Sequence, residues 1–128
     1  MPFMYEKELI VDILNNVLSS MEQVLRRFQV IRSSEDFVKD DVGREKLDSV
    51  CMQLIAMGEA LKQIDKLTGG ELLTKYPGVD WKKAMGMRDI IAHHYFDIDH
   101  ETVYVVCHEH LPEMREAVVR MLDDLVKS

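Results

Sequence analysis

The segment DVGREKLDSVCMQLIAMGEALKQIDKL, residues 41–67, carries the clearest structural signal in this 128-residue chain. Its apolar side chains recur at spacings of three and four residues, the period of one face of an α-helix. We therefore predict a long helix with Asp40 or Asp41 as its N-cap and an end near Leu67. This helix should be central to the fold, because it buries a continuous stripe formed by Leu47, Val50, Leu54, Met57, Leu61 and Ile64, which Cys51 and Ile55 broaden.

Helical spacing continues on both sides of the central helix. Residues 5–32 predict a helix whose apolar face comprises Ile10, Leu14, Val17, Met21, Val24 and Phe28. A short helix should follow through Lys39, with Ser33 and Ser34 as its cap. Asp99 or Thr102 begins the last helical region, which Pro112 is expected to split because a helix interior does not readily accommodate proline. Beyond the proline, the core stripe continues through Met114, Val118, Met121 and Leu125.

The middle of the chain contains strong helix-breaking signals. Residues 68–70, Thr-Gly-Gly, should end the central helix, since glycine readily adopts the left-handed conformation of a C-cap. A short helical turn through Thr74 and a turn at residues 76–78, Tyr-Pro-Gly, should follow. Asp80 then caps a helix that begins at Trp81 and stops near Phe96.

These patterns predict an all-α fold, an antiparallel bundle of four or five helices with short connections in a single domain spanning residues 1–128. Residues 103–107 are the only segment of strand-like composition, and without a partner strand nearby we predict helix there. Gly58 lies inside the central helix, where it costs roughly 1 kcal/mol against alanine. A glycine at this place indicates close approach by a neighbouring helix.

The composition is that of an ordinary soluble protein, with 47% hydrophobic and 30% charged residues. The net charge of −7 argues against broad, sequence-blind binding of nucleic acid, so any RNA contact must be local. Cys51 and Cys107 lie in apolar helical patterns and imply no disulfide framework. With no signal-peptide pattern and no membrane-span pattern, we expect a cytoplasmic protein with no membrane partner.

One short segment, residues 87–97 with the sequence MRDIIAHHYFD, combines residues suited to phosphodiester chemistry. It contains the pattern R-x-x-x-x-H-x-Y, formed by Arg88, His93 and Tyr95. Arginine offers a planar fork of donors to phosphate oxygens, and histidine can exchange a proton near neutral pH. Each of these side chains is more often an ordinary surface group, so the spacing alone remains a hypothesis.

In a continuous helix, Trp81, Arg88 and Tyr95 would share one stripe, because they are seven residues apart. Asp89 would lie one turn from His93 and could orient its imidazole. Arg88 and His93 would point about 140° apart. They converge only if the arginine side chain reaches round, if the helix ends near His93, or if a second subunit completes the site.

Other constellations give weaker signals. The five histidines lack the spacing that brings two imidazoles together on one helix face, and no cysteine pair assists, so we expect no metal site and no cofactor. No glycine-rich phosphate loop or nucleophile elbow is present. Glu59, at the margin of the central apolar stripe, is either a surface carboxylate or a half-buried partner for Arg88.

Several short motifs together resemble the HepT-like toxins, which are small members of the HEPN superfamily. The resemblance extends over nearly the whole chain and is strongest from about Gly58 to Pro112. The motifs occur in the family's order and spacing, and they are Gly58-Glu59-Ala60, the segment YPGVDW at 76–81, Gly86-Met87-Arg88-Asp89, the segment HHYF at 93–96, and Leu111-Pro112.

The resemblance implies a homodimeric helical bundle in which two motif segments meet in one cleft. It further implies a metal-independent ribonuclease whose active residues map to Arg88 and His93. A polar residue follows the arginine in the family; Asp89 fits this, although asparagine is more usual. A cognate minimal nucleotidyltransferase antitoxin would neutralise such a toxin by AMPylation of the motif tyrosine, here Tyr95.

The sequence is therefore consistent with two functions of different classes. The first is a toxin ribonuclease acting on RNA, with Arg88, His93 and Asp89 in the catalytic site and Glu59 in support. The second is a non-catalytic helical module that binds a nucleotide or serves mainly as the partner of the nucleotidyltransferase.

Overall fold

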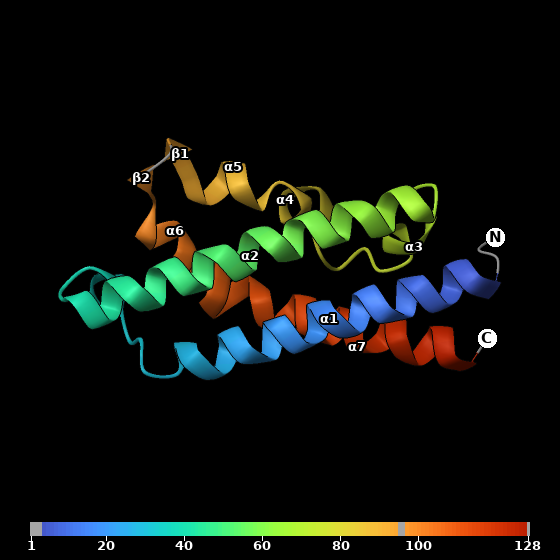
Figure 1. The fold of residues 1–128 in the computed structure, drawn as a ribbon, viewed down its shortest axis with the longest axis horizontal. Helices are drawn as coiled ribbons and strands as arrows, with labels where there is room; N and C mark the ends of the chain where they lie inside the picture. The colour runs from blue at the N-terminus through green and yellow to red at the C-terminus, as the bar shows by residue number, and fades with distance from the viewer. Residues whose placement is uncertain (1–3, 95–96, 128) are drawn as a thin grey trace.

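The computed structural model describes residues 4–94 and 97–127, and it is an all-α bundle with one small hairpin. Four rods run alternately up and down along the long axis (Figure 1). The first rod is α1 (Met4–Phe28) and the second is α2 (Asp41–Leu67). The third joins α4 (Trp81–Met85) to α5 (Met87–Ile91). The fourth comprises α6 (His100–Val105), the π-helical turn η2 (Val106–His110) and α7 (Leu111–Lys127). The predicted antiparallel bundle is confirmed.

The core lies between these rods, along the predicted stripes. All six stripe residues of α2 are buried, as are the six predicted on α1. On α7, Met114, Val118 and Met121 are buried, whereas Leu125 is only partly covered. Helix α1 contacts both α2 and α7, so its apolar face closes one side of the bundle. None of the helices in the described ranges combines the length and apolar content that a membrane span requires.

Aspartate side chains bond to backbone amides at the starts of α2 and of the short helix before it. Asp40 caps α2 by accepting a hydrogen bond from the Gly43 amide at 2.8 Å, which confirms the predicted start of that helix. The short helix η1 (Ser34–Phe37) also occurs, but as a 3₁₀ turn without a side-chain cap from Ser33. Instead, Asp36 reaches back to accept from the Arg32 amide at 2.8 Å. Ser33 therefore occupies the predicted N-cap position but makes no side-chain capping bond, and α1 ends at Phe28, four residues before Arg32.

The turns of the middle segment follow the glycine and proline signals. Gly69 and Gly70 have φ angles of 60° and 78°, the left-handed conformation that ends α2. The short helix α3 (Glu71–Thr74) follows as predicted, and then the Tyr-Pro-Gly turn. Trp81 is buried, and its indole nitrogen donates to the Tyr76 carbonyl at 2.8 Å. This bond fixes the turn against the start of α4.

The segment from residue 81 to residue 94 departs most from prediction. The predicted continuous helix is interrupted at Gly86, whose φ and ψ of −93° and 25° separate α4 from α5. The helix then ends at Ile91, five residues before the predicted stop at Phe96. Strand β1 (Ala92–His94) follows and pairs in antiparallel orientation with β2 (Asp97–Ile98). No strand was predicted from the sequence, so this hairpin is a correction.

The last rod is helical through residues 103–107, which confirms helix for the only strand-like segment. Pro112 does not split this rod as predicted. The backbone instead continues through η2, where the Leu111 amide bonds to the Val106 carbonyl, five residues back. The π-helical turn shifts the hydrogen-bond register just before the proline, and the proline falls in the first turn of α7, where a missing amide is tolerated.

Candidate active site

Arg88 lies on the short helix α5, which α2 supports from beneath. Gly58 of α2 makes this contact possible, since a Cβ atom there would lie 2.8 Å from the Ala84 carbonyl oxygen and 3.2 Å from the Met87 Cβ. The close approach predicted from Gly58 is therefore confirmed. Met87 and Ile91 of α5 are buried, whereas Arg88 and Asp89 between them are exposed. The burial of its neighbours thus fixes Arg88 on the outer side of α5.

The guanidinium of Arg88 is available for an outside ligand. Within the described part of the chain it takes part in no hydrogen bond or ion pair. A planar donor fork without an internal partner can bind a phosphate in bidentate fashion. Asp89 is also exposed, and its amide bonds to the Gly86 carbonyl at 3.0 Å in the first turn of α5.

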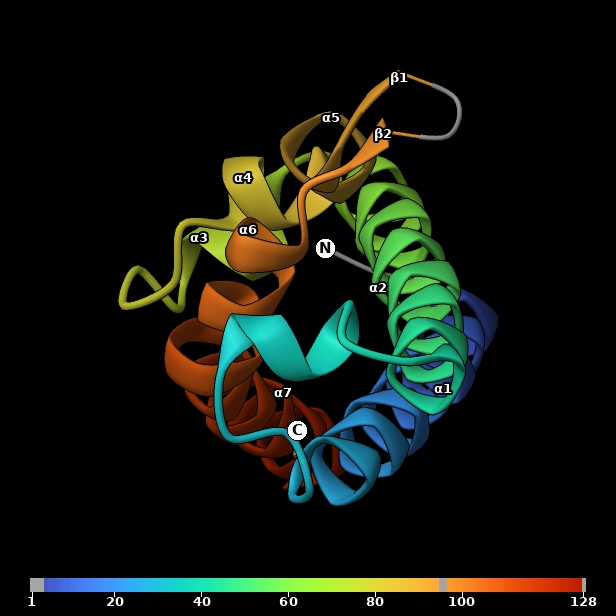
Figure 2. The same ribbon diagram turned by 90° about the vertical axis from the view of Figure 1, so that its left-hand side faces the viewer.

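His93 lies on β1, immediately after α5. The Ala92–Ile98 and His94–Asp97 pairs form the hairpin, with an irregularity in register between Ala92 and His94. At its base, the Asp99 amide donates to the Ile91 carbonyl at 2.8 Å, which joins the end of α5 to the start of α6. The two strands project outward from the side of the bundle next to α5 (Figure 2). Arg88 and His93 were predicted to converge in one of three ways, and one of these was a helix that ends near His93. The structure has this feature, since α5 ends at Ile91.

Two parts of the predicted motif lie outside the described residues, namely Tyr95 and the side chain of His93. The predicted stripe of Trp81, Arg88 and Tyr95 is wrong nonetheless. Trp81 is 7% exposed and faces the core, whereas Arg88 faces outward, because the break at Gly86 changes the helical phase between them. Asp89 and His93 likewise do not share one helix, since α5 ends at Ile91.

Glu59 does not act as a half-buried partner for Arg88 within this subunit. It is exposed on α2, and its carboxylate lies 3.5 Å from the Lys62 ammonium. This geometry is that of a surface carboxylate. Among the described residues, no group of three or more histidine, cysteine or acidic side chains is placed to hold a metal ion.

The fold and site define a class of protein, a small all-α bundle that displays an arginine on a short helix and a histidine on the hairpin that follows. The sequence matches the family model described as ribonuclease HepT-like over residues 17–121. The chain belongs to the ribonuclease HepT-like family, within the HEPN superfamily. This confirms the resemblance drawn from the sequence motifs.

Similar proteins occur in an archaeon and a bacterium. The chain is 30% identical over 112 residues to the protein named "Putative RNase MJ0125" of Methanocaldococcus jannaschii, covering 88% of this chain and 90% of the relative. It is 32% identical over 109 residues to "Putative RNase TTE0752" of Caldanaerobacter subterraneus subsp. tengcongensis, covering 85% and 90% respectively. No solved structure gave a significant match.

The division of the site between a helix, which carries Arg88, and a strand, which carries His93, was not predicted from the sequence. The available signals were Gly86, which weakens a helix in its interior, and the polar pair Asp97 and Asp99 close behind the motif. They permitted a break and a cap but did not specify that two short segments would pair as strands.

Proposed function

We propose that this protein is a toxin ribonuclease that cleaves RNA without a metal ion. The observation that carries the proposal is the family match over residues 17–121, which includes the R-x-x-x-x-H-x-Y motif. Two features of the fold support it. Arg88 is exposed, and its guanidinium has no partner among the described residues; the motif histidine follows on a hairpin that extends from the bundle.

The proposed chemistry uses the substrate's own nucleophile. His93 takes the proton from a ribose 2′-hydroxyl, and the oxygen attacks the adjacent phosphorus. Arg88 stabilises the negative charge that builds on the phosphoryl oxygens, while the 5′-oxygen of the next nucleotide leaves and takes a proton from solvent water. The product then ends in a 2′,3′-cyclic phosphate. Asp89 has a positioning role in this scheme, as the polar residue beside the arginine.

A two-fold dimer completes the proposed site, because it brings two arginines and two histidines to one cleft. The face of α4 that carries Ala84 does not support dimerisation. Ala84 is 4% exposed, since it packs against Gly58 within the subunit. The proposed dimer therefore rests on family membership and on the exposed Arg88. A supporting role for Glu59 would require its carboxylate to exchange Lys62 for a group outside this subunit.

The proposed partner is a minimal nucleotidyltransferase antitoxin that modifies Tyr95. It would transfer the adenylyl group of ATP to the phenol oxygen and release pyrophosphate. The bound nucleotide would add negative charge beside Arg88 and repel the RNA backbone. Incubation with the neighbouring nucleotidyltransferase and ATP should add one adenylyl mass to the peptide containing Tyr95, and Tyr95→Phe should abolish it. Modification at Tyr104 or Tyr76 instead would contradict this switch.

The test of the ribonuclease is cleavage of end-labelled RNA in the presence of EDTA. Arg88→Ala and His93→Ala should each lower the rate by about 10²–10⁴, typical for the loss of a group that moves a proton or stabilises charge in the transition state. The matched controls are Arg44→Ala and His108→Ala, which replace an exposed arginine and an exposed histidine elsewhere. DNA should remain uncut. Activity that survives in His93→Ala, or that EDTA removes, would contradict the mechanism. An inactive wild type would favour the non-catalytic binding module.

A further inference from the structure

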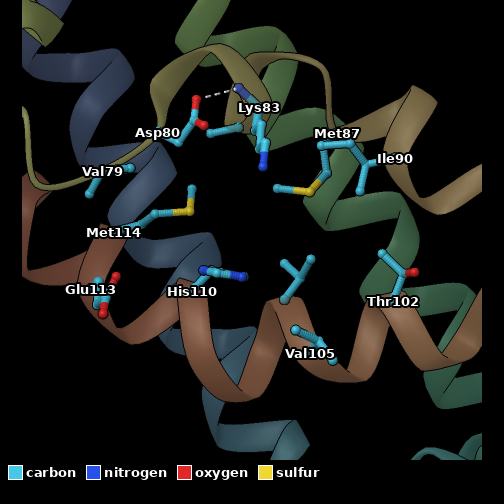
Figure 3. A pocket seen from close by; sticks show the side chains of 12 residues that line it. Val79, Asp80, Lys83, Met87, Ile90, Thr102, Val105, His110, Glu113 and Met114 are labelled. Atoms are coloured by element: carbon cyan, nitrogen blue, oxygen red, sulfur yellow. Dashed lines mark hydrogen bonds between the residues drawn. The ribbon is translucent and has the colours of Figure 1, made fainter.

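A cavity of about 270 Å³ lies on the other side of the motif segment, between the third and fourth rods of the bundle (Figure 3). Helices α4 and α5 form one wall, and α6, η2 and the start of α7 form the other. Met87 and Ile90 face the cavity, while their neighbours Arg88 and Asp89 are exposed to solvent. The cavity is therefore separate from the proposed RNA site. It is open at one side to solvent, so a small molecule can enter.

The walls of this cavity are mostly apolar. They include Met87, Ala84 and Ile90 on one side and Val105, Val106 and Met114 on the other. The side chains of Met87 and Met114 both extend toward its centre (Figure 3). Methionine is flexible and polarizable, and its sulfur makes favourable contacts with aromatic rings. Such walls suit a flat or branched apolar body.

Two nitrogen-bearing side chains reach into the cavity from opposite walls, Lys83 of α4 and His110 of η2 (Figure 3). Neither takes part in a hydrogen bond or ion pair within the described residues. The nearby carboxylates are placed differently. Asp80 is occupied as the cap of α4, where it accepts from the Lys83 amide at 3.2 Å, and Glu113 lies at the edge of the cavity. Lys83 and His110 can therefore each donate a hydrogen bond into the cavity.

The position of His110 depends on the π-helical turn. It is the last residue of η2, the turn that also places Val106 in the cavity wall. A π-helical turn is less stable than regular α-helix and is found frequently at functional sites. Pro112, which lacks an amide donor, gives a local reason for the changed backbone hydrogen bonds of η2. As a consequence, the His110 imidazole points toward the wall that carries Lys83.

We propose that this cavity binds a small organic anion with an apolar body of about ten non-hydrogen atoms. This size follows from the volume of the cavity, which is at the low end of the range for ligand pockets. The body would lie between Met87 and Met114. The carboxylate or phosphate of the ligand would accept a charge-assisted hydrogen bond from the Lys83 ammonium and a hydrogen bond from the His110 imidazole. This site is distinct from the proposed RNA site, and its test does not depend on nuclease activity.

The test is an NMR titration of the protein labelled with ¹³C at its methionine methyl groups. Benzoate and phenyl phosphate are the anionic probes, and benzyl alcohol and benzylamine are matched neutral and cationic controls. The Met87 and Met114 resonances should shift with the anions, with Kd near or below about 1 mM. The resonance of Met52, which is 74% exposed on α2, should not move. The anions should bind at least about tenfold more tightly than the two controls, as expected for a charge-assisted contact.

Variants separate charge recognition from simple apolar filling. Lys83→Gln and His110→Gln should each weaken benzoate binding several-fold and leave the benzyl alcohol titration unchanged. Lys82→Gln is the matched control, because Lys82 is the exposed neighbour of Lys83 and does not line the cavity. Equal binding of all four probes, an unchanged benzoate affinity in Lys83→Gln, or the absence of any shift at Met87 and Met114 would overturn the proposal.

Discussion

Gly58 lies at the contact between the core helix α2 and the rod that carries Arg88. Its missing side chain allows α2 to approach the backbone at Ala84 and the first residue of α5. An added methyl group would lie 2.8 Å from the Ala84 carbonyl oxygen, which belongs to the backbone and cannot rotate away. The third rod, with Arg88 on its outer side, would have to move outward.

Gly58→Ala should therefore destabilise the fold although alanine favours helix. Overpacking typically costs about 1–3 kcal/mol, which exceeds the gain of about 1 kcal/mol in helix propensity. Gly86→Ala is the matched control, since its Cβ would meet the nearest atom at an ordinary 3.5 Å. Urea denaturation should show a lower free energy of unfolding for Gly58→Ala only. Equal stability of Gly58→Ala and wild type would contradict the close contact.

The two cysteines should be chemically inert in the folded protein. Burial raises the pKa of both the Cys51 thiol and the Cys107 thiol to about 12, and neighbouring Asp48 adds to the effect at Cys51. Because the thiolate is the reactive form, labelling at pH 8 should be slow and should require unfolding. A thiol-reactive dye should label both residues in urea and neither in buffer. Rapid labelling of the native protein would contradict the buried placement.

At the level of single elements, α2 depends on a carboxylate at its first turn. Asp40 accepts from the Gly43 amide, whereas its neighbour Asp41 is the first residue of the helix and is exposed. Asp40→Ala should lower the free energy of unfolding by about 1 kcal/mol, the usual loss for an N-cap. Asp41→Ala should have a smaller effect. Thermal or urea denaturation of the two variants measures the difference, and equal losses would contradict the assignment of the cap.

The helices that could be predicted are those whose apolar spacing coincides with burial. Leu47 to Ile64 on α2 and Ile10 to Phe28 on α1 are examples, because a long amphipathic face determines both helix and orientation. The motif segment lacks such a face. A helix that continued through Gly86 would place Trp81 and Arg88, seven residues apart, on the same face. Because the helix breaks at Gly86, Trp81 faces the core and Arg88 faces solvent. The strands could not be predicted, since two- and three-residue segments are too short to show alternation.

The same distinction applies to the candidate site. Arg88 could be predicted as a residue type suited to phosphate, and the structure adds its exposure. The end of α5 at Ile91 depends on the hairpin and on the bond from the Asp99 amide to the Ile91 carbonyl, a contact between residues eight apart. Helical periodicity carries no information about such a contact.

At the scale of the whole molecule, one hydrogen bond ties the Tyr-Pro-Gly turn to the last helix. The Tyr76 hydroxyl donates to Asp124 at 2.6 Å, and Arg120 lies 5.9 Å from the ring centroid. Burial and then the bond to Asp124 raise the pKa of Tyr76 to about 12 from an ordinary value of 10. The neutral phenol therefore stabilises the fold below pH 10, and this stability is lost as the pH rises toward 12.

Tyr76→Phe should lower the free energy of unfolding by about 1 kcal/mol at pH 8, the typical value of one hydrogen bond. The difference from wild type should shrink above pH 10, because the unfolded tyrosine ionises there before the folded one. Urea denaturation at pH 8 and pH 10.5 measures both values. The buried cysteines are present in both proteins, so their titration cancels in the comparison. A difference that is constant with pH would contradict the neutral donor.

The assembly proposed for the ribonuclease predicts a specific rescue. A two-fold axis pools two copies of Arg88 and two of His93 in one cleft. Light scattering at micromolar concentration should therefore report a dimer, and a monomer would contradict the shared cleft. Co-expression of Arg88→Ala and His93→Ala subunits with different affinity tags allows the mixed dimer to be purified. That dimer retains one intact arginine and one intact histidine, on opposite subunits.

If each catalytic pair in the cleft combines Arg88 of one subunit with His93 of the other, the mixed dimer retains one intact pair out of two. It should therefore regain about half of the wild-type activity. Each parent homodimer should stay lower by about 10²–10⁴. The end of α5 at Ile91 is relevant here, because Arg88 and His93 lie on different elements and no single helix face has to present both. A mixed dimer as inactive as its parents would mean that each subunit requires its own pair. In that case the arginine would have to reach the hairpin of the same chain.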